Sequence, residues 1–279
     1  MVIPSSLRKN LLILTIILSV IGLLTSLYLV KNHYAPATSA SFCDLSVSVS
    51  CSLVNTSTFS VFLGVPVAVF GALWFVVLAA LAWRALRKDG AFIFGLLVWN
   101  VVGILSVVYL IIAEIILQAL CPFCTVVHAI IVITLIFSII LYKRTPKISV
   151  EKALRELRTW IIAVFLITII IFILFNISSK QQEDHTVLAQ CLTEKGVVMY
   201  GSSRCAVCAK TRALFGPAFQ YVTEIECYPG QENSQTELCL SQKIAGTPTW
   251  VMEQEGIEQK RQQGFLSIEE LQTFSGCEE

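Results

Sequence analysis

The chain has 279 residues, of which 56% are hydrophobic and only 14% are charged, and its mean hydropathy is +0.75. Ordinary soluble domains carry about 25% charged residues, so this composition excludes a water-soluble protein and indicates a membrane protein. The formal net charge of +1 gives no reason to expect a nucleic-acid partner, and the sequence contains neither a GxGxxG pattern nor a Walker phosphate loop. Its ten cysteines are the feature that most needs an explanation.

Five apolar stretches are each long enough to cross a bilayer. A helix rises about 1.5 Å per residue and crosses the roughly 30 Å hydrocarbon core in about 20 residues. Among all the residues of these stretches, the only Asp, Glu, Lys or Arg is Glu114. The sequence therefore predicts five transmembrane helices, at Asn10–Val30, Leu63–Trp83, Ala91–Leu117, Cys121–Tyr142 and Trp160–Ile177.

The first stretch has an alternative interpretation as a cleaved signal peptide. Arg8 and Lys9 precede it, and residues 37–40 are rich in small side chains. Its apolar length exceeds the roughly 7–15 residues of a signal-peptide core. We therefore expect Asn10–Val30 to remain as a membrane helix.

The Lys and Arg residues are distributed unevenly between the two sides of the predicted bundle. Segments 1–9, 84–90 and 143–159 hold eleven of them, whereas segments 31–62 and 118–120 hold only Lys31. The positive-inside rule then predicts a cytoplasmic N-terminus and places the 31–62 loop and everything after Ile177 outside. No cysteine faces the cytoplasm in this orientation, which indicates disulfide chemistry on an oxidising side rather than metal binding.

The chain from Ser178 onward is predicted to form a separate acidic domain, because it holds eight basic and fourteen acidic residues. Two sequences, Ser234-x-x-Glu237 and Ser267-x-x-Glu270, predict capping boxes at helix starts. Hydrophobic periodicity predicts strands at Val197–Tyr200, Tyr221–Glu226 and Thr249–Glu253, and helices at Cys205–Phe215, Thr236–Lys243 and Ile268–Phe274.

Within this domain, Cys205-Ala-Val-Cys208 follows a predicted strand and opens a predicted helix. The unpaired N–H groups and the dipole at a helix N-terminus favour the thiolate, which is the attacking species. We expect Cys205 to be the exposed attacking residue and Cys208 to close the disulfide. The alternative is a structural disulfide in a small secreted domain.

The same domain resembles the thioredoxin fold over its whole length. Gly246-Thr247-Pro248-Thr249 matches the cis-proline loop of that fold, which lies against the CxxC motif. The residues before the motif, Ser202-Ser203-Arg204, depart from the aromatic residue that commonly precedes the first cysteine.

Two further cysteine pairs belong to the membrane part. Cys121-Pro-Phe-Cys124 lies on the first turn of the fourth predicted span, where a thiolate can meet a lipid-soluble oxidant; the alternative is a disulfide that joins the third and fourth helices. Cys43 and Cys51 lie in a serine-rich outer loop that can move between two disulfide partners, or else simply close the loop.

A second resemblance is carried by these residues. Cys43-x7-Cys51, Gly64-Val65-Pro66 with Phe70-Gly71, and Cys121-x-x-Cys124 are similar to the vitamin K epoxide reductase family. The fifth helix and thioredoxin-like tail resemble the fused bacterial members of that family. The region from Gly64 to Gly71 contains no asparagine, and His128 stands where the animal enzymes have a tyrosine, so quinone reduction is favoured over epoxide reduction.

The resemblance implies a path for electrons. Cys205–Cys208 would oxidise thiols of secreted or periplasmic proteins, and Cys205 would pass the electrons to Cys43. Cys51 would relay them to Cys121, and Cys124 would deliver them to a membrane quinone of the ubiquinone, menaquinone or phylloquinone type. His128 is a candidate for hydrogen bonding to that quinone, although packing between helices explains it equally well; no metal is expected.

The predicted organisation has three parts: a four-helix membrane domain at 1–145, a linker with the fifth helix at 146–183, and a thioredoxin-like domain at 184–279. The expected location is a bacterial inner membrane or a thylakoid, with the thioredoxin-like domain on the periplasmic or luminal side. Alternative functions are a reductant importer of the same fold and a non-enzymatic redox sensor or binding module on a membrane anchor.

Four cysteines and two acidic residues remain to be assigned. Cys227 and Cys239 are expected to form a structural disulfide, which leaves Cys191 and Cys277 as the last pair. Glu114 is either a functional intramembrane acid or a side chain that reaches water. Asp44 either tunes the neighbouring Cys43 or is an ordinary loop residue.

Overall fold

The computed structural model describes residues 4–34, 43–46, 48–87, 90–146, 148–180, 184–231, 233–254 and 256–278. The chain forms two compact units, one comprising residues 1–34 and 58–180 and the other residues 35–57 and 181–279. The segment with Cys43 and Cys51 therefore belongs to the same unit as the C-terminal domain, although it lies between two membrane helices in the sequence.

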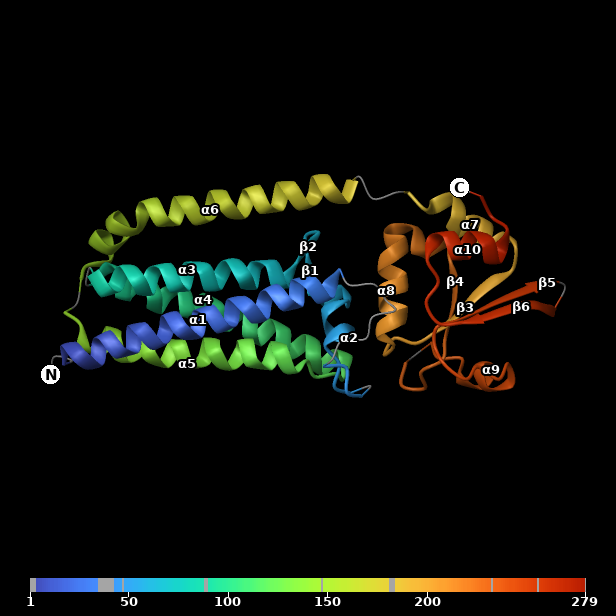
Figure 1. The fold of residues 1–279 in the computed structure, drawn as a ribbon, viewed down its shortest axis with the longest axis horizontal. Coiled ribbons are helices and arrows are strands. Elements are labelled where there is room, and N and C mark those ends of the chain that lie inside the picture. Colours follow the sequence, from blue (N-terminus) through green and yellow to red (C-terminus); the bar gives the residue numbers. More distant parts are fainter. Residues whose placement is uncertain are drawn as a thin grey trace. The chain divides into compact units, whose positions relative to one another are not determined.

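The first unit consists mainly of five long apolar helices (Figure 1). All five are long and apolar enough to cross a membrane, which confirms the prediction of a multi-pass helical membrane protein. The first and last of these helices extend beyond both ends of the predicted apolar stretches, and the second and fourth extend only at their C-terminal ends, because polar residues there continue the helical backbone past the hydrocarbon core. The third has the predicted bounds, and the second begins only after residues 63–66, which were predicted to open it. Their bounds are α1 (Ser5–His33), α3 (Val67–Arg87), α4 (Ala91–Leu117), α5 (Pro122–Arg144) and α6 (Val150–Lys180).

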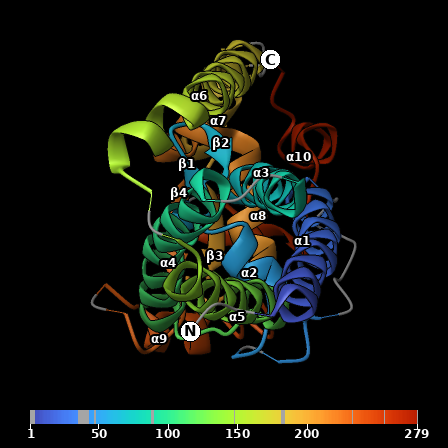
Figure 2. The same ribbon diagram turned by 90° about the vertical axis from the view of Figure 1, so that its left-hand side faces the viewer.

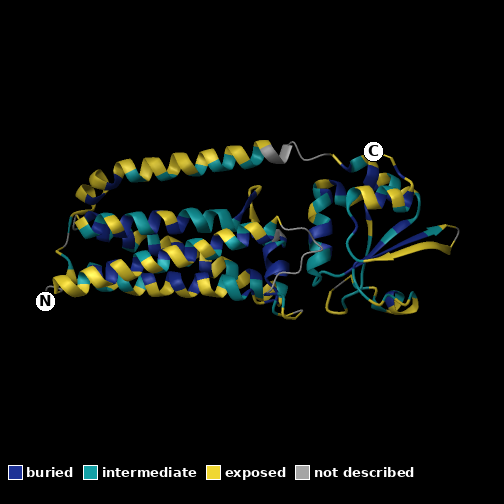
Figure 3. Cartoon of the chain, in the orientation of Figure 1, coloured by how far each residue is buried: buried dark blue, intermediate teal, exposed yellow. Residues whose placement is uncertain are grey.

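Four of these helices, α1, α3, α4 and α5, surround a common apolar core, and α6 lies outside them (Figure 2). Small residues allow close packing: a Cβ atom at Gly22 of α1 would collide with the Phe75 ring of α3, and one at Gly103 of α4 would meet Trp74. The most apolar part of α6 has no buried residue, as Figure 3 shows, and its surface therefore suits contact with lipid.

A buried polar cluster links α4 and α5 inside this core. The Asn100 side-chain amide donates to the Ser138 hydroxyl over 3.0 Å, and the Thr134 hydroxyl donates to Oδ1 of Asn100 over 2.7 Å. All three side chains are buried, and each has a partner. Because unsatisfied polar groups are costly in the membrane, this cluster stabilises the α4–α5 pairing.

The second unit is built on a four-stranded sheet with the order β4-β3-β5-β6. Strand β3 (Val197–Gly201) is parallel to β4 (Thr223–Glu226) and antiparallel to β5 (Thr249–Gln254), which pairs in turn with β6 (Ile257–Gln263). The helices are α2 (Cys51–Asn55), α7 (Thr186–Glu194), α8 (Ala206–Phe215), α9 (Thr236–Ser241) and α10 (Ile268–Ser275), with a 3₁₀ helix at Gly216–Tyr221. This α/β arrangement is that of a thioredoxin-like domain, as predicted.

Successive side chains along the strands point to opposite faces of the sheet and form one apolar core on each face. Val197 and Met199 of β3 face a core formed with α7 and α10, whereas Val198 and Tyr200 face the opposite side, where α9 packs. Strand β5 follows the same rule, because Trp250 belongs to the first core and its neighbour Val251 to the second.

The sequence did not predict α2 or the 3₁₀ helix at Gly216–Tyr221, and one of the two predicted capping boxes does not form. Helix α7 was not predicted, nor was β6, whose residues are exposed throughout and carry no alternating pattern. The capping box at Ser267 forms as predicted. The one at Ser234 does not, because α9 begins after Gln235 and the Ser234 hydroxyl lies instead 2.7 Å from that of Thr236.

Candidate functional site

The first cysteine pair of interest opens α8. Cys205 is the N-cap residue, in extended conformation, and its sulfur accepts a hydrogen bond from the Cys208 N–H over 3.0 Å. The two residues form a disulfide with a Cα–Cα distance of 5.2 Å. Cys205 is half-buried, whereas Cys208 is fully buried. This difference in accessibility suits an attacking first cysteine and a second cysteine that closes the disulfide.

Two neighbouring segments shape the surroundings of Cys205. The Thr247–Pro248 peptide bond is cis, and the Thr247 carbonyl oxygen lies 3.3 Å from the Cys205 sulfur, as the thioredoxin resemblance implied. Arg204, which stands where an aromatic residue is common, donates to the Tyr228 hydroxyl over 2.7 Å and lies over that ring. The residue that precedes the first cysteine is thus a cation whose guanidinium is held by Tyr228.

The Cys43–Cys51 pair lies in the same unit. These residues form a disulfide with a Cα–Cα distance of 5.8 Å, and both are buried. Asp44 orders the segment between them, because its carboxylate accepts from the Ser50 hydroxyl over 2.7 Å and from the Ser52 N–H over 2.9 Å. Ser50 in turn caps α2 by accepting from Leu53. Cys51 thereby begins a short, capped helix.

Helix α2 packs against α8, and an electrostatic contact accompanies this packing. Asp44 interacts with Lys210, which lies two residues after Cys208 and is buried. Burial lowers the pKa of Lys210 below its ordinary value, and the negative charge of Asp44 partly opposes that effect. The contact ties the segment of the Cys43–Cys51 disulfide to the helix that begins with the Cys205–Cys208 disulfide.

The membrane CxxC pair repeats the local geometry seen at α8. Cys121 is the N-cap of α5 in extended conformation, and its sulfur accepts from the Cys124 N–H over 3.1 Å. The two cysteines form a disulfide with a Cα–Cα distance of 5.2 Å. Here the first cysteine is fully buried and the second is half-buried. Phe123 between them contacts Tyr28 of α1, with ring centroids 4.9 Å apart.

Glu114 belongs to this second site. Its carboxylate accepts a hydrogen bond from the Cys121 N–H over 3.1 Å, and its carbonyl oxygen accepts from the Ala119 N–H over 3.1 Å. Oxygen and sulfur atoms of Glu114, Cys121 and Cys124 lie within 4.8 Å of one another. Because the two sulfurs are bonded to each other, this group is a disulfide with a neighbouring carboxylate rather than a set of thiolate ligands.

His128 lies one helical turn after Cys124 on α5 and is buried. Its Nε2 atom has no hydrogen-bond partner among the residues that the structure describes. A buried polar atom without a partner is costly, and a carbonyl group of a small molecule would satisfy it. The imidazole therefore fits a quinone beside Cys124 on chemical grounds.

The other four cysteines form two disulfides within the C-terminal domain. Cys227, just after β4, is bonded to Cys239 of α9, and Cys191 of α7 is bonded to Cys277 beyond α10. The second of these joins segments 86 residues apart in sequence. Neither pair occupies a helix N-terminus, which distinguishes both from the two CxxC disulfides.

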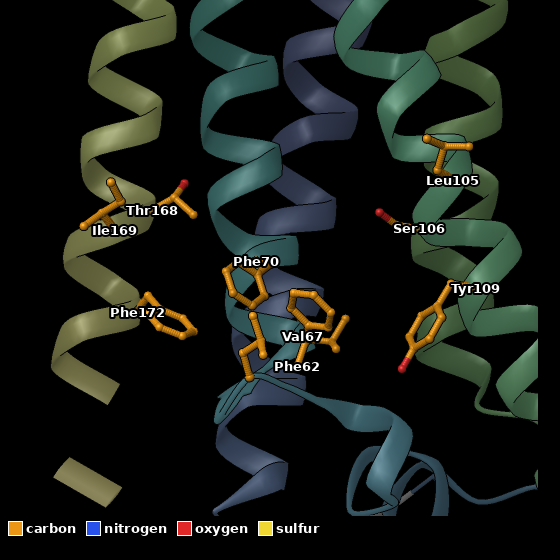
Figure 4. Close-up of a pocket in the computed structure, with 10 residues that line it drawn as sticks. Phe62, Val67, Phe70, Leu105, Ser106, Tyr109, Thr168, Ile169 and Phe172 are labelled. Atoms are coloured by element: carbon orange, nitrogen blue, oxygen red, sulfur yellow. The ribbon is translucent and has the colours of Figure 1, made fainter. Parts of the chain in front are cut away.

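The first unit also contains an apolar cavity of about 610 Å³. It lies between α3, α4 and α6, beside a two-stranded hairpin formed by β1 (Val61–Phe62) and β2 (Val65–Pro66) (Figure 4). The Tyr109 hydroxyl at its edge donates to the Phe59 carbonyl, and the Thr168 hydroxyl donates to Val164. Among the described residues that line it there is no cysteine, and the lining is almost entirely apolar, so the cavity suits an apolar molecule.

The structure thus brings the predicted residues into three separate disulfides and adds two residues with new partners. The sequence did not predict a role for Lys210. For Glu114 it left two roles open, a functional intramembrane acid and a side chain that reaches water. A lysine shortly after a CxxC motif is a weak sequence signal, because its counter-ion Asp44 is distant in the sequence.

The comparison with known proteins agrees with this arrangement. The sequence profile of the vitamin K epoxide reductase family matches residues 13–139, which contain the Cys43–Cys51 and Cys121–Cys124 pairs. The thiol-disulfide oxidoreductase LTO1 of Arabidopsis thaliana is 30% identical over 105 residues. This match covers 36% of the present chain and 27% of the plant protein, so it spans about a quarter of that relative. Residues 13–139 therefore form a domain of the vitamin K epoxide reductase family.

Proposed function

We propose that this protein is a membrane thiol:disulfide oxidoreductase that takes electrons from protein thiols and passes them to a quinone, and so supports disulfide formation. The observation that carries the proposal is the presence of two CxxC disulfides, each at a helix N-terminus, on a membrane helix and on a thioredoxin-like domain. The similarity to a thiol-disulfide oxidoreductase supports the same activity.

The first half of the path uses the second unit. One thiolate of a client dithiol attacks Cys205 of the Cys205–Cys208 disulfide and forms a mixed disulfide. The second thiol of the client then breaks that bond, so the client leaves as a disulfide and Cys205 and Cys208 are both reduced. Cys205 then attacks Cys43, and Cys208 resolves the mixed disulfide. Contacts within this unit support the second step, because α2 packs against α8 and Asp44 interacts with Lys210.

The second half of the path ends in the membrane. Cys51 attacks Cys121, so the electrons reach the Cys121–Cys124 pair. Cys121 and Cys124 return to the disulfide by losing two electrons and two protons, for which a quinone held beside Cys124 would be the acceptor. His128, whose Nε2 has no hydrogen-bond partner in the described part of the chain, would orient the acceptor.

Charge distribution supports an outward-facing site. The loops rich in Lys and Arg contain no cysteine, so a donor on the cytoplasmic side would find no thiol there. Oxidising compartments are maintained by quinone-coupled relays of this kind, and a potential difference of about 30 mV is worth about 1.4 kcal/mol for a two-electron couple. We therefore favour export of electrons from client thiols over import of reductant.

Two experiments test the proposal. Reconstituted protein is supplied with a reduced thiol substrate and a soluble quinone analogue, and quinone reduction is followed by absorbance. Replacing Cys124 with Ala should abolish it, and Cys43→Ala should stop transfer from the thioredoxin-like domain. Unchanged turnover in Cys124→Ala would refute the assigned role of that residue.

Trapping locates the transfer between the pairs. With Cys208 and Cys51 both replaced by Ala, Cys205 and Cys43 have no resolving partners and should form a disulfide within one chain, identified by mass spectrometry. The matched control replaces Cys227 and Cys239 instead and should leave no such crosslink. Absence of the Cys205–Cys43 bond would remove Cys43 from the path.

A further inference from the structure

Glu114 is unusual because of where it lies. It is the only charged residue within the five predicted apolar stretches. Acidic residues in such positions are costly and are commonly functional. In the structure its side chain is directed at the Cys121–Cys124 pair, since the carboxylate accepts the Cys121 N–H over 3.1 Å.

Its own helix does not explain this placement. Glu114 lies in the last turn of α4, where the helix dipole is unfavourable for a negative charge. The same carboxylate meets the N-terminus of the next helix, α5, where backbone N–H groups and the dipole favour an anion. The acid is therefore stabilised by the segment that holds the disulfide.

Glu114 is also well placed for proton exchange with the sulfurs. Its carboxylate oxygen lies within 4.8 Å of both the Cys121 and Cys124 sulfur atoms. Among the described residues, no Lys or Arg forms an ion pair with it. Two other titratable groups lie at this end of α5: His128, one turn beyond Cys124, and Tyr28 of α1, whose ring contacts Phe123. Acid–base contacts of this kind are often loose before the reacting state forms.

We infer that Glu114 is the acid–base residue of the Cys121–Cys124 pair. The inference rests on the proposed function, in which this pair is reduced by a dithiol and then reoxidised. Reduction breaks the Cys121–Cys124 bond with two electrons from the dithiol, which itself becomes a disulfide. Of the two protons that the dithiol loses, Cys124 takes one, and Glu114 delivers the other to Cys121. On reoxidation the carboxylate takes the proton back from Cys121 and Cys124 gives up its own proton, and these two protons would go to the quinone together with the two electrons.

The first test measures how fast dithiothreitol reduces the Cys121–Cys124 disulfide in the full-length protein, by quenched alkylation and mass spectrometry. Glu114→Gln retains an oxygen that accepts the Cys121 N–H but cannot exchange a proton. We expect reduction at pH 7 to slow on the order of tenfold, with partial recovery in Glu114→Asp. The control, Glu151→Gln, removes an acid that pairs with Arg155 on α6 and should leave the rate unchanged.

The second test measures the alkylation rate of Cys121 as a function of pH in protein carrying Cys124→Ser and kept reduced. A neighbouring carboxylate disfavours the thiolate, so Glu114→Gln should make Cys121 react several-fold faster at pH 7. The two expected effects have opposite signs, with faster alkylation but slower disulfide reduction. A residue that only positions the turn would change neither, because Gln preserves the hydrogen bond.

The outcomes decide between the two roles. Opposite effects in the two assays support the inference. An alkylation profile identical to that of the wild type, or an unchanged reduction rate in Glu114→Gln, overturns it. Neither assay contains quinone, so both remain informative if the wild-type protein fails to reduce a quinone, a result that would reject the proposed function separately.

Discussion

The two CxxC motifs are nearly identical in local geometry but differ in their surroundings. In both, the first cysteine is an extended N-cap, and its sulfur accepts from the second N–H over 3.1 Å at α5 and 3.0 Å at α8. Both pairs have a Cα–Cα distance of 5.2 Å. A CxxC motif at a helix start thus adopts the same N-cap geometry in a membrane helix and in the thioredoxin-like domain.

The surroundings differ in accessibility and in charge. At α8 the first cysteine is the more accessible one, whereas at α5 it is the second. Arg204, a cation, precedes the soluble pair, and Glu114, an anion, meets the membrane pair. Because the local geometry is shared, we expect these neighbours to determine which sulfur reacts and how easily its thiolate forms.

The largest expected effect follows from accessibility at α8. Cys205→Ala and Cys208→Ala should both reduce turnover to background, but only Cys208→Ala should accumulate a mixed disulfide with a thiol client, because Cys205 remains to attack. Non-reducing electrophoresis with mass spectrometry measures this. Client adducts formed through Cys208 in Cys205→Ala would contradict the assigned order.

The next effect separates the redox disulfides from the structural ones. Closing a loop of 86 residues, as Cys191–Cys277 does, stabilises a domain by up to about 4–5 kcal/mol in the chain-entropy treatment. Closing the 12-residue separation of Cys227–Cys239 is worth about 3 kcal/mol. Paired replacement by Ser should lower the free energy of unfolding in that order. Reduction of either CxxC disulfide should lower the free energy of unfolding much less. Denaturant unfolding measures these free energies, and a different order among the variants would contradict the prediction.

Sequence reasoning captured the features that depend on near neighbours. A CxxC after a strand and before a helix fixes the N-cap geometry of Cys205, because the contacts involve residues three positions apart. The same locality explains the correct capping box at Ser267. Apolar length alone was sufficient for the five membrane helices.

Features that depend on distant residues were missed or left open. Asp44 interacts with Lys210, although 166 positions separate their residue numbers, and neither residue type specifies the other. Strand β6 exists because it pairs with β5, not because of an alternating pattern of its own. Ser234 had the sequence of a cap, but α9 begins after the next residue. In each case tertiary packing determined the result.

A medium effect is expected at the Asp44–Lys210 contact, which has no counterpart described at α5. Burial lowers the pKa of Lys210 in the folded state, so the unfolded chain binds more protons between the lowered value and the ordinary one. Stability should therefore rise with pH through that window, as the cost of the buried charge disappears. Lys210→Met should remove this rise, measured as melting temperature against pH.

Replacing Asp44 sharpens the same test. Without its carboxylate, Lys210 loses the charge that opposes burial, and Asp44→Asn should destabilise the second unit near neutral pH by about 1 kcal/mol, or several degrees in melting temperature. It should also reduce the yield of the Cys205–Cys43 crosslink. An unchanged yield would show that the contact does not hold the two cysteine pairs together.

The smallest effect concerns the cation beside Cys205. Arg204→Gln removes a charge that favours the Cys205 thiolate, and alkylation of Cys205 at pH 7 should slow by roughly threefold, in the opposite direction to the effect of Glu114→Gln on Cys121. The change is modest because the guanidinium is held by the Tyr228 hydroxyl and is partly screened by solvent. Raising the salt concentration should shrink the difference between wild type and variant. If both replacements moved their cysteines in the same direction, charge would not be what distinguishes the two motifs.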